Sequence, residues 1–299
     1  MEFAEWYTRE GCGLSADEPM SLIGTHLSVS GGLHRAVERA SLLEVEAMQI
    51  FTGNPLQWRG RSLSLADVDS FRRALLNSSV KSVVVHSSYL INLAGEDGVR
   101  RKSIDAMTGE IERCYQLGVD SVVLHPGSST GRDRGEAIGQ LILSLGEVLA
   151  RTEKNPVRIL LETMAGAGGT LGVSIEELGY VIDALGWNDC LGICADICHL
   201  FGAGVDVRSD GGYERLVASI EKHVGISRVG CFHLSDNKGP RGSNVDRHEH
   251  LGQGEIGIIP FGMVVSDERF EKTPCILETP KDGIGDEGNI ALLKKMRGA

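Results

Sequence analysis

The feature that most constrains the fold is a repeat in which eight short, mostly apolar runs alternate with longer segments of helical spacing. The runs end about every 36 residues, which is close to the length of one strand-plus-helix unit. Several runs are apolar throughout, as in parallel strands that are buried on both faces. The predicted strands are Leu22–His26, Ala47–Phe51, Ser82–His86, Ser121–His125, Arg158–Glu162, Leu191–Asp196, Arg228–His233 and Pro274–Glu278.

The segments between the runs have apolar residues at helical spacing and polar residues on the other face. Ser174 followed by Ile-Glu-Glu is typical of a capping box at a helix N-terminus. The predicted helices are Leu33–Leu43, Asp67–Leu76, Arg100–Leu117, Glu136–Arg151, Ser174–Leu185, Tyr213–His223 and Asn289–Met296.

Eight strand-plus-helix units predict an α/β fold, a (β/α)8 barrel in one domain. Residues 21–299 form the predicted barrel domain, and residues 1–20 form a short N-terminal extension. A doubly wound open sheet is the alternative, but the chain lacks the G-x-G-x-x-G motif that such sheets often carry after the first strand.

Composition limits the class of protein. The net charge of −11 argues against a nucleic-acid-binding protein when taken alone. No apolar run approaches the ~20 residues that a membrane helix needs, and the first twenty residues do not form a signal peptide. An odd number of scattered cysteines indicates reduced thiols and a cytoplasmic protein. The spacing of Cys190, Cys194 and Cys198 favours core cysteines over a zinc ribbon.

The residues that end the predicted strands indicate a metal site. In a barrel, all strand C-termini meet on one face, which is where the chemistry takes place. A single histidine there is more often structural, but this many coincidences favour a shared site. His26 ends the first strand, and six further strands end in His86, His125, Glu162, Asp196, His233 and Glu278.

Two local pairs add three further ligands to these six. His199 follows Asp196 at i+3, and Asp246 and His248 lie two residues apart in the long Gly-rich stretch 239–257. Imidazoles with carboxylates suit Zn²⁺ or Mn²⁺ in an open catalytic site. Because one catalytic zinc takes three or four protein ligands, nine candidates predict two or three clustered metals.

Eight segments together resemble the endonuclease IV family of abasic-site endonucleases, also called AP endonuclease family 2, which has a xylose isomerase-like barrel. The resemblance runs in order from about Leu22 to the last helix. The segments are GTHLSVSGGL, FTGNPLQWR, HSSYLINLA, HPGSS, LETMAGAGGTLG, CADICHLFGAGVD, HLSDNKGPRGSNVDRHEHLGQGEIG and ILETP.

The resemblance implies a DNA repair hydrolase with three zinc ions that cleaves duplex DNA 5′ to abasic sites, as in base excision repair. Glu162 and Glu278 are the implied catalytic residues, although Glu278 is equally explained as a ligand only. The first implied metal is held by His86, His125 and Glu162. Glu162 bridges to a second that is completed by Asp196, His233 and Glu278, and a third is held by His199, Asp246 and His248.

The same resemblance implies DNA contacts. Tyr89 and Leu90 match positions that enter the DNA at the lesion, whereas Leu56 stands where family members carry arginine. Three zinc ions would also offset about six negative charges at the cleft. Further expected DNA contacts are Gln57, Arg59, Arg61, Lys238, Arg241 and Arg247, although about half of the basic ones are equally explained as solvated surface charges.

Two other functions remain open. A metal-dependent sugar isomerase or epimerase on the related barrel would need only Glu162, Asp196, His233 and Glu278. It would not need His86, His125, His199 or the pair Asp246 and His248. A catalytically silent DNA-lesion binder is the other alternative, which the intact ligand set disfavours. We also expect the chain to be a monomer.

Overall fold

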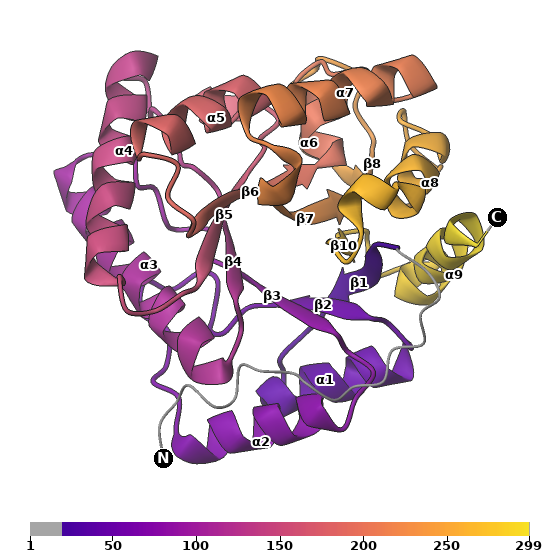
Figure 1. The fold of residues 1–299 in the computed structure, drawn as a ribbon, viewed down its shortest axis with the longest axis horizontal. Coiled ribbons are helices and arrows are strands. Elements are labelled where there is room, and N and C mark those ends of the chain that lie inside the picture. The colour runs from indigo at the N-terminus through magenta and orange to yellow at the C-terminus, as the bar shows by residue number, and fades with distance from the viewer. Residues whose placement is uncertain (1–19, 299) are drawn as a thin grey trace.

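The apolar runs pair with one another as parallel neighbours and close into a barrel (Figure 1). The computed structural model describes residues 20–298, and the prediction of a (β/α)8 barrel is confirmed. Around the barrel the order is β1-β10-β7-β6-β5-β4-β3-β2. These strands are β1 (Leu22–His26), β2 (Ala47–Ile50), β3 (Ser82–His86), β4 (Ser121–Leu124), β5 (Arg158–Glu162), β6 (Leu191–Asp196), β7 (Val229–Leu234) and β10 (Pro274–Leu277).

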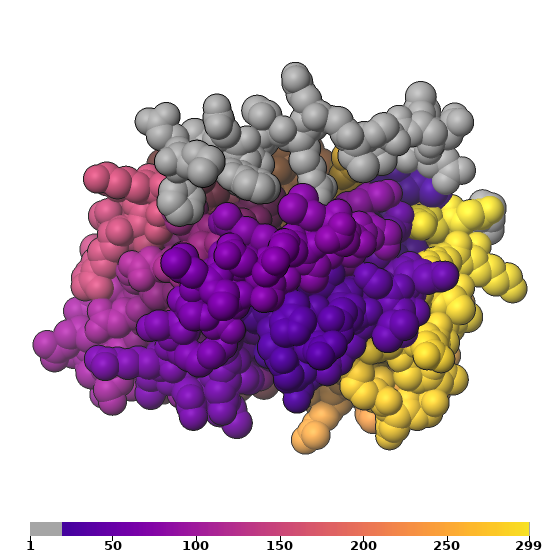
Figure 2. Space-filling view, turned by 90° about the horizontal axis from the view of Figure 1, so that it is seen from below, coloured from indigo at the N-terminus to yellow at the C-terminus, as the bar shows by residue number. Residues whose placement is uncertain are grey.

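The helices surround the strands (Figure 1). On one face of the molecule the N-terminal part of the described chain, in indigo, adjoins the C-terminal part, in yellow (Figure 2), as the pairing of β1 with β10 requires. None of the described helices is long and apolar enough to cross a bilayer. The helices are α1 (Leu33–Leu42), α2 (Leu65–Leu76), α3 (Asp97–Leu117), α4 (Arg134–Arg151), α5 (Ile175–Ala184), α6 (Ile197–Gly202), α7 (Asp210–His223), α8 (Ile259–Ser266) and α9 (Gly285–Arg297).

Two helices and one hairpin were not expected from the sequence. Helix α6 has six residues, which is too short to show helical spacing, and α8 has no polar face to reveal a period. The hairpin is formed by β8 (Asp236–Asn237), which precedes the Gly-rich stretch, and β9 (His248–Glu249), which lies within it. The two strands pair antiparallel. At α5, Ser174 accepts a hydrogen bond from the amide of Glu177, as the predicted cap requires. The Glu177 carboxylate instead pairs with Arg134.

The barrel interior explains why ligand-type residues gather at one end. One buried residue from each strand forms a layer inside the barrel. Because side chains alternate along a strand, the residue two positions later points inward as well, nearer the C-terminal face. On six strands this later residue is a histidine or a carboxylate, on β2 it is Gln49, and on β1 it is Gly24. The interior layer is Leu22, Ala47, Val84, Val123, Leu160, Cys194, Cys231 and Ile276.

Candidate metal centre

Six inward-pointing residues meet at the C-terminal face of the barrel, and we call them the strand-end cluster. Glu162, at the end of β5, lies at its centre and is fully buried. Its Oε2 lies 3.2 Å from Nε2 of His86 and 3.1 Å from Nε2 of His125, while its Oε1 lies 3.1 Å from Nδ1 of His233. The strand-end cluster consists of His86, His125, Glu162, Asp196, His233 and Glu278.

The two oxygens of Glu162 therefore face different partners, as a bridging carboxylate must. On the second side, Nδ1 of His233 lies 3.7 Å from Asp196 Oδ2 and 3.7 Å from Glu278 Oε2. The two carboxylate oxygens of Asp196 also face different partners. Its Oδ1 accepts the amide of His199 at 2.7 Å and caps α6, which leaves Oδ2 facing the cluster.

The remaining three ligand-type residues adjoin this group, and we call His199, Asp246 and His248 the rim cluster. Nε2 of His199 lies 3.3 Å from Asp246 Oδ2, and Nε2 of His248 lies 3.2 Å from Asp246 Oδ1. Asp246 is 48% exposed, whereas His199 is buried. The rim cluster thus lies between the barrel floor and the surrounding solvent.

Backbone carbonyls orient three of the imidazoles. Nδ1 of His86 lies 2.8 Å from the Ser87 carbonyl, and Nδ1 of His199 lies 2.8 Å from the Thr163 carbonyl. Nδ1 of His248 lies 2.7 Å from the carbonyl of Glu278. Because a carbonyl only accepts, each Nδ1 carries a proton, and Nε2 is the nitrogen that each ring turns toward its cluster.

These distances fit metal ions held between the side chains. Two atoms bound at 2.0–2.2 Å to one tetrahedral zinc lie about 3.4 Å apart. Three buried atoms of the two clusters also lack a hydrogen bond within residues 20–298: Asp196 Oδ2, His199 Nε2 and His248 Nε2. Buried polar atoms without partners are costly, and cations bound in the two clusters would satisfy all three.

Charge within the strand-end cluster favours a cation as well. Burial alone would raise the pKa of Glu162, but His125 and His233 hold it well below its ordinary value. Burial would lower the pKa of His233, but Glu278 and Glu162 raise it well above its ordinary value. Glu162 therefore stays ionised although it is buried, which requires positive charge nearby.

The Gly-rich stretch is held by two buried residues that the sequence reasoning missed. The Asp236 carboxylate accepts the amides of Asn237, Gly252, Ile256 and Gly257 at 2.8–3.2 Å. The Asn237 side-chain amide donates to the carbonyls of Cys198 and Val245. A Cβ at Gly254 would lie 2.4 Å from the Asn237 carbonyl oxygen, so this crossing requires glycine. Together these contacts place Asp246 and His248 opposite α6.

The expected DNA-contacting loops after β2 and β3 are joined to each other. The Ser88 hydroxyl donates to the Pro55 carbonyl at 2.7 Å, and the Tyr89 amide donates to the same oxygen at 3.2 Å. The Tyr89 ring, 53% exposed, lies 5.5 Å from the His86 ring between centroids. Leu56 is 68% exposed, Gln57 is exposed and Leu90 is half-buried.

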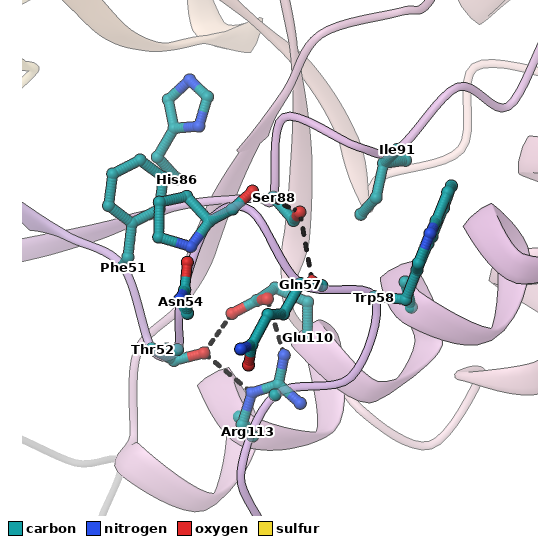
Figure 3. Close-up of a pocket in the computed structure, with 14 residues that line it drawn as sticks. Phe51, Thr52, Asn54, Gln57, Trp58, His86, Ser88, Ile91, Glu110 and Arg113 are labelled. Atoms are coloured by element: carbon teal, nitrogen blue, oxygen red, sulfur yellow. Dashed lines mark hydrogen bonds and ion pairs between the residues drawn. The ribbon is translucent and has the colours of Figure 1, made fainter.

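A buried polar group supports the β2 loop from below (Figure 3). The Arg113 guanidinium donates to the Thr52 hydroxyl at 2.8 Å and to the Glu110 carboxylate at 2.6 Å. Thr52 in turn donates to Glu110. Since both charged residues belong to α3, the loop is fixed at its root while its tip stays exposed.

The expected basic DNA contacts fall into two groups, and all five are exposed. Arg61 pairs with Asp67, Lys238 with Glu249, and Arg241 with Asp206. Arg59 and Arg247 make no ion pair with any residue of the described range. These two arginines are therefore the ones whose charge is available to a phosphate.

Two further groups adjoin the centre. His26 is oriented toward Gln49, whose Nε2 lies 3.0 Å from its Nδ1, and it belongs to none of the metal-capable groups in residues 20–298. Cys194 and Cys198 are buried and Cys190 is half-buried, and no cysteine of the described residues is in a disulfide. Cys12 lies outside the described residues.

The fold and the clusters define a metal-dependent (β/α)8 barrel, and comparisons with known proteins narrow this class. The model of the xylose isomerase-like TIM barrel family matches residues 37–297. The probable endonuclease 4 of Chloroflexus aurantiacus is 41% identical over 280 residues, which cover 93% of this chain and 98% of that protein. The probable endonuclease 4 of Trichlorobacter lovleyi is 40% identical over 277 residues, covering 92% and 99%.

Solved structures agree. Endonuclease IV from Thermus thermophilus superposes with a TM-score of 0.80 at 35% identity, covering 93% of this chain and 98% of that one. A D-tagatose 3-epimerase-like protein has a TM-score of 0.67 at 21% identity, covering 92% and 95%, which shows the fold alone. The chain belongs to the xylose isomerase-like TIM barrel family and, within it, to the endonuclease IV family.

Proposed function

We propose that this chain is a zinc-dependent repair endonuclease that hydrolyses the phosphodiester 5′ to an abasic site in duplex DNA. The products are a 3′-hydroxyl and a 5′-deoxyribose phosphate. The observation that carries the proposal is two adjoining clusters, nine ligand-type residues in all, whose facing atoms lie 3.1–3.7 Å apart. Membership of the endonuclease IV family supports a DNA-cleaving hydrolase.

The side chains suggest three zinc positions. His86, His125 and Glu162 would hold the first, and Glu162 would join it to a second that Asp196, His233 and Glu278 complete. His199, Asp246 and His248 would hold the third. Zinc bound there would supply Lewis-acid activation of water and would neutralise negative charge on the phosphate.

The protein side chains determine how a phosphate approaches. The floor of the centre, Glu162, Asp196 and His233, is fully buried, whereas His125 and Asp246 are partly exposed. The scissile phosphate would therefore enter between His125 and Asp246. Glu278 remains ionised because its pKa is held well below its ordinary value: burial opposes ionisation, but His233 and His26 outweigh it. Its Oε2 would either orient the attacking water or act as a ligand only.

Recognition of the lesion would come from the loops after β2 and β3. Tyr89 and Leu90 would enter the duplex where a base is missing, because an exposed apolar wedge stabilises unstacked DNA. Leu56 and Gln57 would contact the opposite side of the lesion, since the two loops are hydrogen-bonded into one unit. Arg59 and Arg247, and to a smaller extent Lys238, would contact backbone phosphates. We propose that the protein acts as a monomer.

The epimerase alternative has less support. A sugar isomerase of this fold would need only four residues, Glu162 among them, and it would leave the rim cluster without a role. The unpartnered Nε2 atoms of His199 and His248 face Asp246 rather than the barrel axis. They extend the site outward, where a long polyanionic substrate would bind.

Metal content and product mapping test the proposal together. Purified protein should contain about three zinc ions per chain by elemental analysis. A duplex with one abasic-site analogue should be cut on its 5′ side to a 3′-hydroxyl, and intact duplex should not be cut at the same rate. A single Mn or Mg per chain with ketose epimerisation would support the isomerase. Tight binding of the lesion without any incision would support a silent lesion binder.

A further inference from the structure

Gln49 occupies a ligand position of the barrel without being a ligand. It lies two residues after Ala47 of the interior layer, where six other strands carry a histidine or a carboxylate. Its side chain is fully buried, and it belongs to none of the metal-capable groups among residues 20–298. A buried amide at this position needs hydrogen-bond partners on both of its ends.

Two of its three partners belong to the strand-end cluster, and the third is His26, whose Nδ1 lies 3.0 Å from the Gln49 Nε2. The Gln49 Nε2 donates to Glu278 Oε1 at 2.6 Å, and the Gln49 Oε1 lies 2.8 Å from Nε2 of His233. An amide donates only through nitrogen and accepts only through oxygen. Turning it over would place its oxygen against the Glu278 carboxylate, with two acceptors in contact. The carboxylate therefore determines the orientation of the amide.

This orientation determines what His233 and Glu278 present to the centre. When the imidazole is neutral, the Gln49 oxygen keeps the His233 proton on Nε2, and the lone pair then lies on Nδ1. That Nδ1 faces Glu162 at 3.1 Å and Asp196 at 3.7 Å. Glu278 is restrained through Oε1, so Oε2 is directed toward the centre.

His233 differs from three other imidazoles of the two clusters in how it is held. His86, His199 and His248 each donate to a backbone carbonyl, which no substitution removes. For His233 the acceptor is a side chain, so its tautomer depends on the residue at position 49.

We propose that Gln49 is a positioning residue that selects the Nε2-protonated tautomer of His233 and directs Glu278 Oε2 inward. Two of the four ligands of the second metal position are thereby arranged before the metal binds. This inference rests on the proposed zinc centre. Residues that orient metal ligands in this way change metal affinity by 10–100-fold when they are replaced.

Three variants separate orientation from packing. Gln49→Met keeps the approximate volume without strong hydrogen bonds, so it tests orientation in a filled core. Gln49→Glu keeps an acceptor for His233 but places a second carboxylate against Glu278. Gln116→Ala on the exposed face of α3 is the matched control.

The first readout is zinc affinity, measured by competition with a chelator. The affinity of each of the zinc ions bound per chain is determined separately. Gln49→Met should weaken one equivalent about 10–100-fold and leave the others close to wild type. The second readout is the His233 tautomer from nitrogen chemical shifts of the metal-free protein, recorded at a pH high enough to make the imidazole neutral. It should be Nε2-protonated in wild type and mixed in Gln49→Met. Thermal unfolding of each metal-free variant reports whether the barrel still folds.

Wild-type affinity for every equivalent in both Gln49 variants, or an unchanged His233 tautomer in Gln49→Met, would overturn the inference. Failure of the proposed function is a different result. In that case wild type would bind zinc without cutting abasic DNA, and the affinity and tautomer measurements would still report on Gln49.

Discussion

The strand-end cluster and the rim cluster present similar side chains, but the chain positions them by different means. Every residue of the strand-end cluster lies within one residue of the C-terminal end of a barrel strand, so strand pairing places it. In the rim cluster, only His199 follows a strand closely. Asp246 and His248 lie on a loop that Asp236 and Asn237 hold through backbone contacts. Rigid barrel strands thus position the strand-end cluster. The rim cluster is positioned by hydrogen bonds within a loop, which single substitutions can remove.

The comparison predicts that damage at the centre of the strand-end cluster has the largest effect. Glu162→Gln removes the carboxylate that faces both sides of the cluster, so two metal positions should be lost together. We expect the single-turnover rate to fall at least about 10³-fold, because that step depends on charge stabilisation. Elemental analysis should show at most one zinc per chain. Retention of all zinc in this variant would contradict the bridging role of Glu162.

Damage to the loop support should affect only the rim cluster. Asp236→Asn replaces one acceptor oxygen with a donor opposite backbone amides, which should cost roughly 2–4 kcal/mol of stability. We expect one zinc equivalent to be lost while the two in the strand-end cluster remain. Asp105→Asn on the surface of α3 is the control, since its exposed ion pair with Arg151 contributes little. Equal loss from all positions would show that the two clusters are not independent.

The rim cluster should also release protons when it binds metal. Burial would lower the pKa of His248, but the hydrogen bond to Asp246 raises it to about 12 in the metal-free chain. At pH 8 this imidazole is therefore protonated, and it must lose its proton to become a ligand. Rim-metal affinity should rise with pH through the neutral range. Calorimetry in buffers of different ionisation enthalpy measures the released protons, and a pH-independent affinity would contradict the prediction.

The exposed loops should influence recognition more than chemistry. Tyr89→Ala should weaken discrimination between lesion and intact duplex by about tenfold, while the rate at saturating DNA changes less, because the ring acts on DNA shape. Affinity and single-turnover rate on both duplexes provide the test. The competing outcome is a loss of rate with unchanged discrimination. That result would mean that Tyr89 acts mainly by packing against the His86 ring.

The smallest effect is expected at Leu56. Leu56→Arg should tighten DNA binding slightly and increase the salt dependence of affinity by up to about one phosphate contact. Arg59→Gln should change the slope in the opposite direction, since Arg59 has no acidic partner in residues 20–298. A salt titration of both variants is the measurement. If neither variant changes the slope, the β2 loop does not contact the DNA backbone.

The barrel and its ligand-type residues could be predicted because both follow from local regularities. Strand and helix periods are properties of short segments, so the eight strands were found within about one residue at each end. Helix α6 and the β8–β9 hairpin could not be predicted, because six residues show no period and two-residue strands have no pattern. The sequence around Asp236 predicts only a turn residue. The four amides reach its carboxylate only in the folded loop.

The sequence by itself determined which residues reach the C-terminal face, since alternation along a strand is independent of the neighbouring strands. Only the tertiary structure decided how those residues are grouped: which oxygen of Glu162 faces which imidazole, and which atom of each imidazole is free. Gln49 shows most clearly what the sequence alone cannot predict. Its place in the inward-pointing series is visible in the sequence, but its role depends on partners 184 and 229 residues away. Barrel closure brings them within hydrogen-bond distance, because β2, β7 and β10 all direct side chains to one axis.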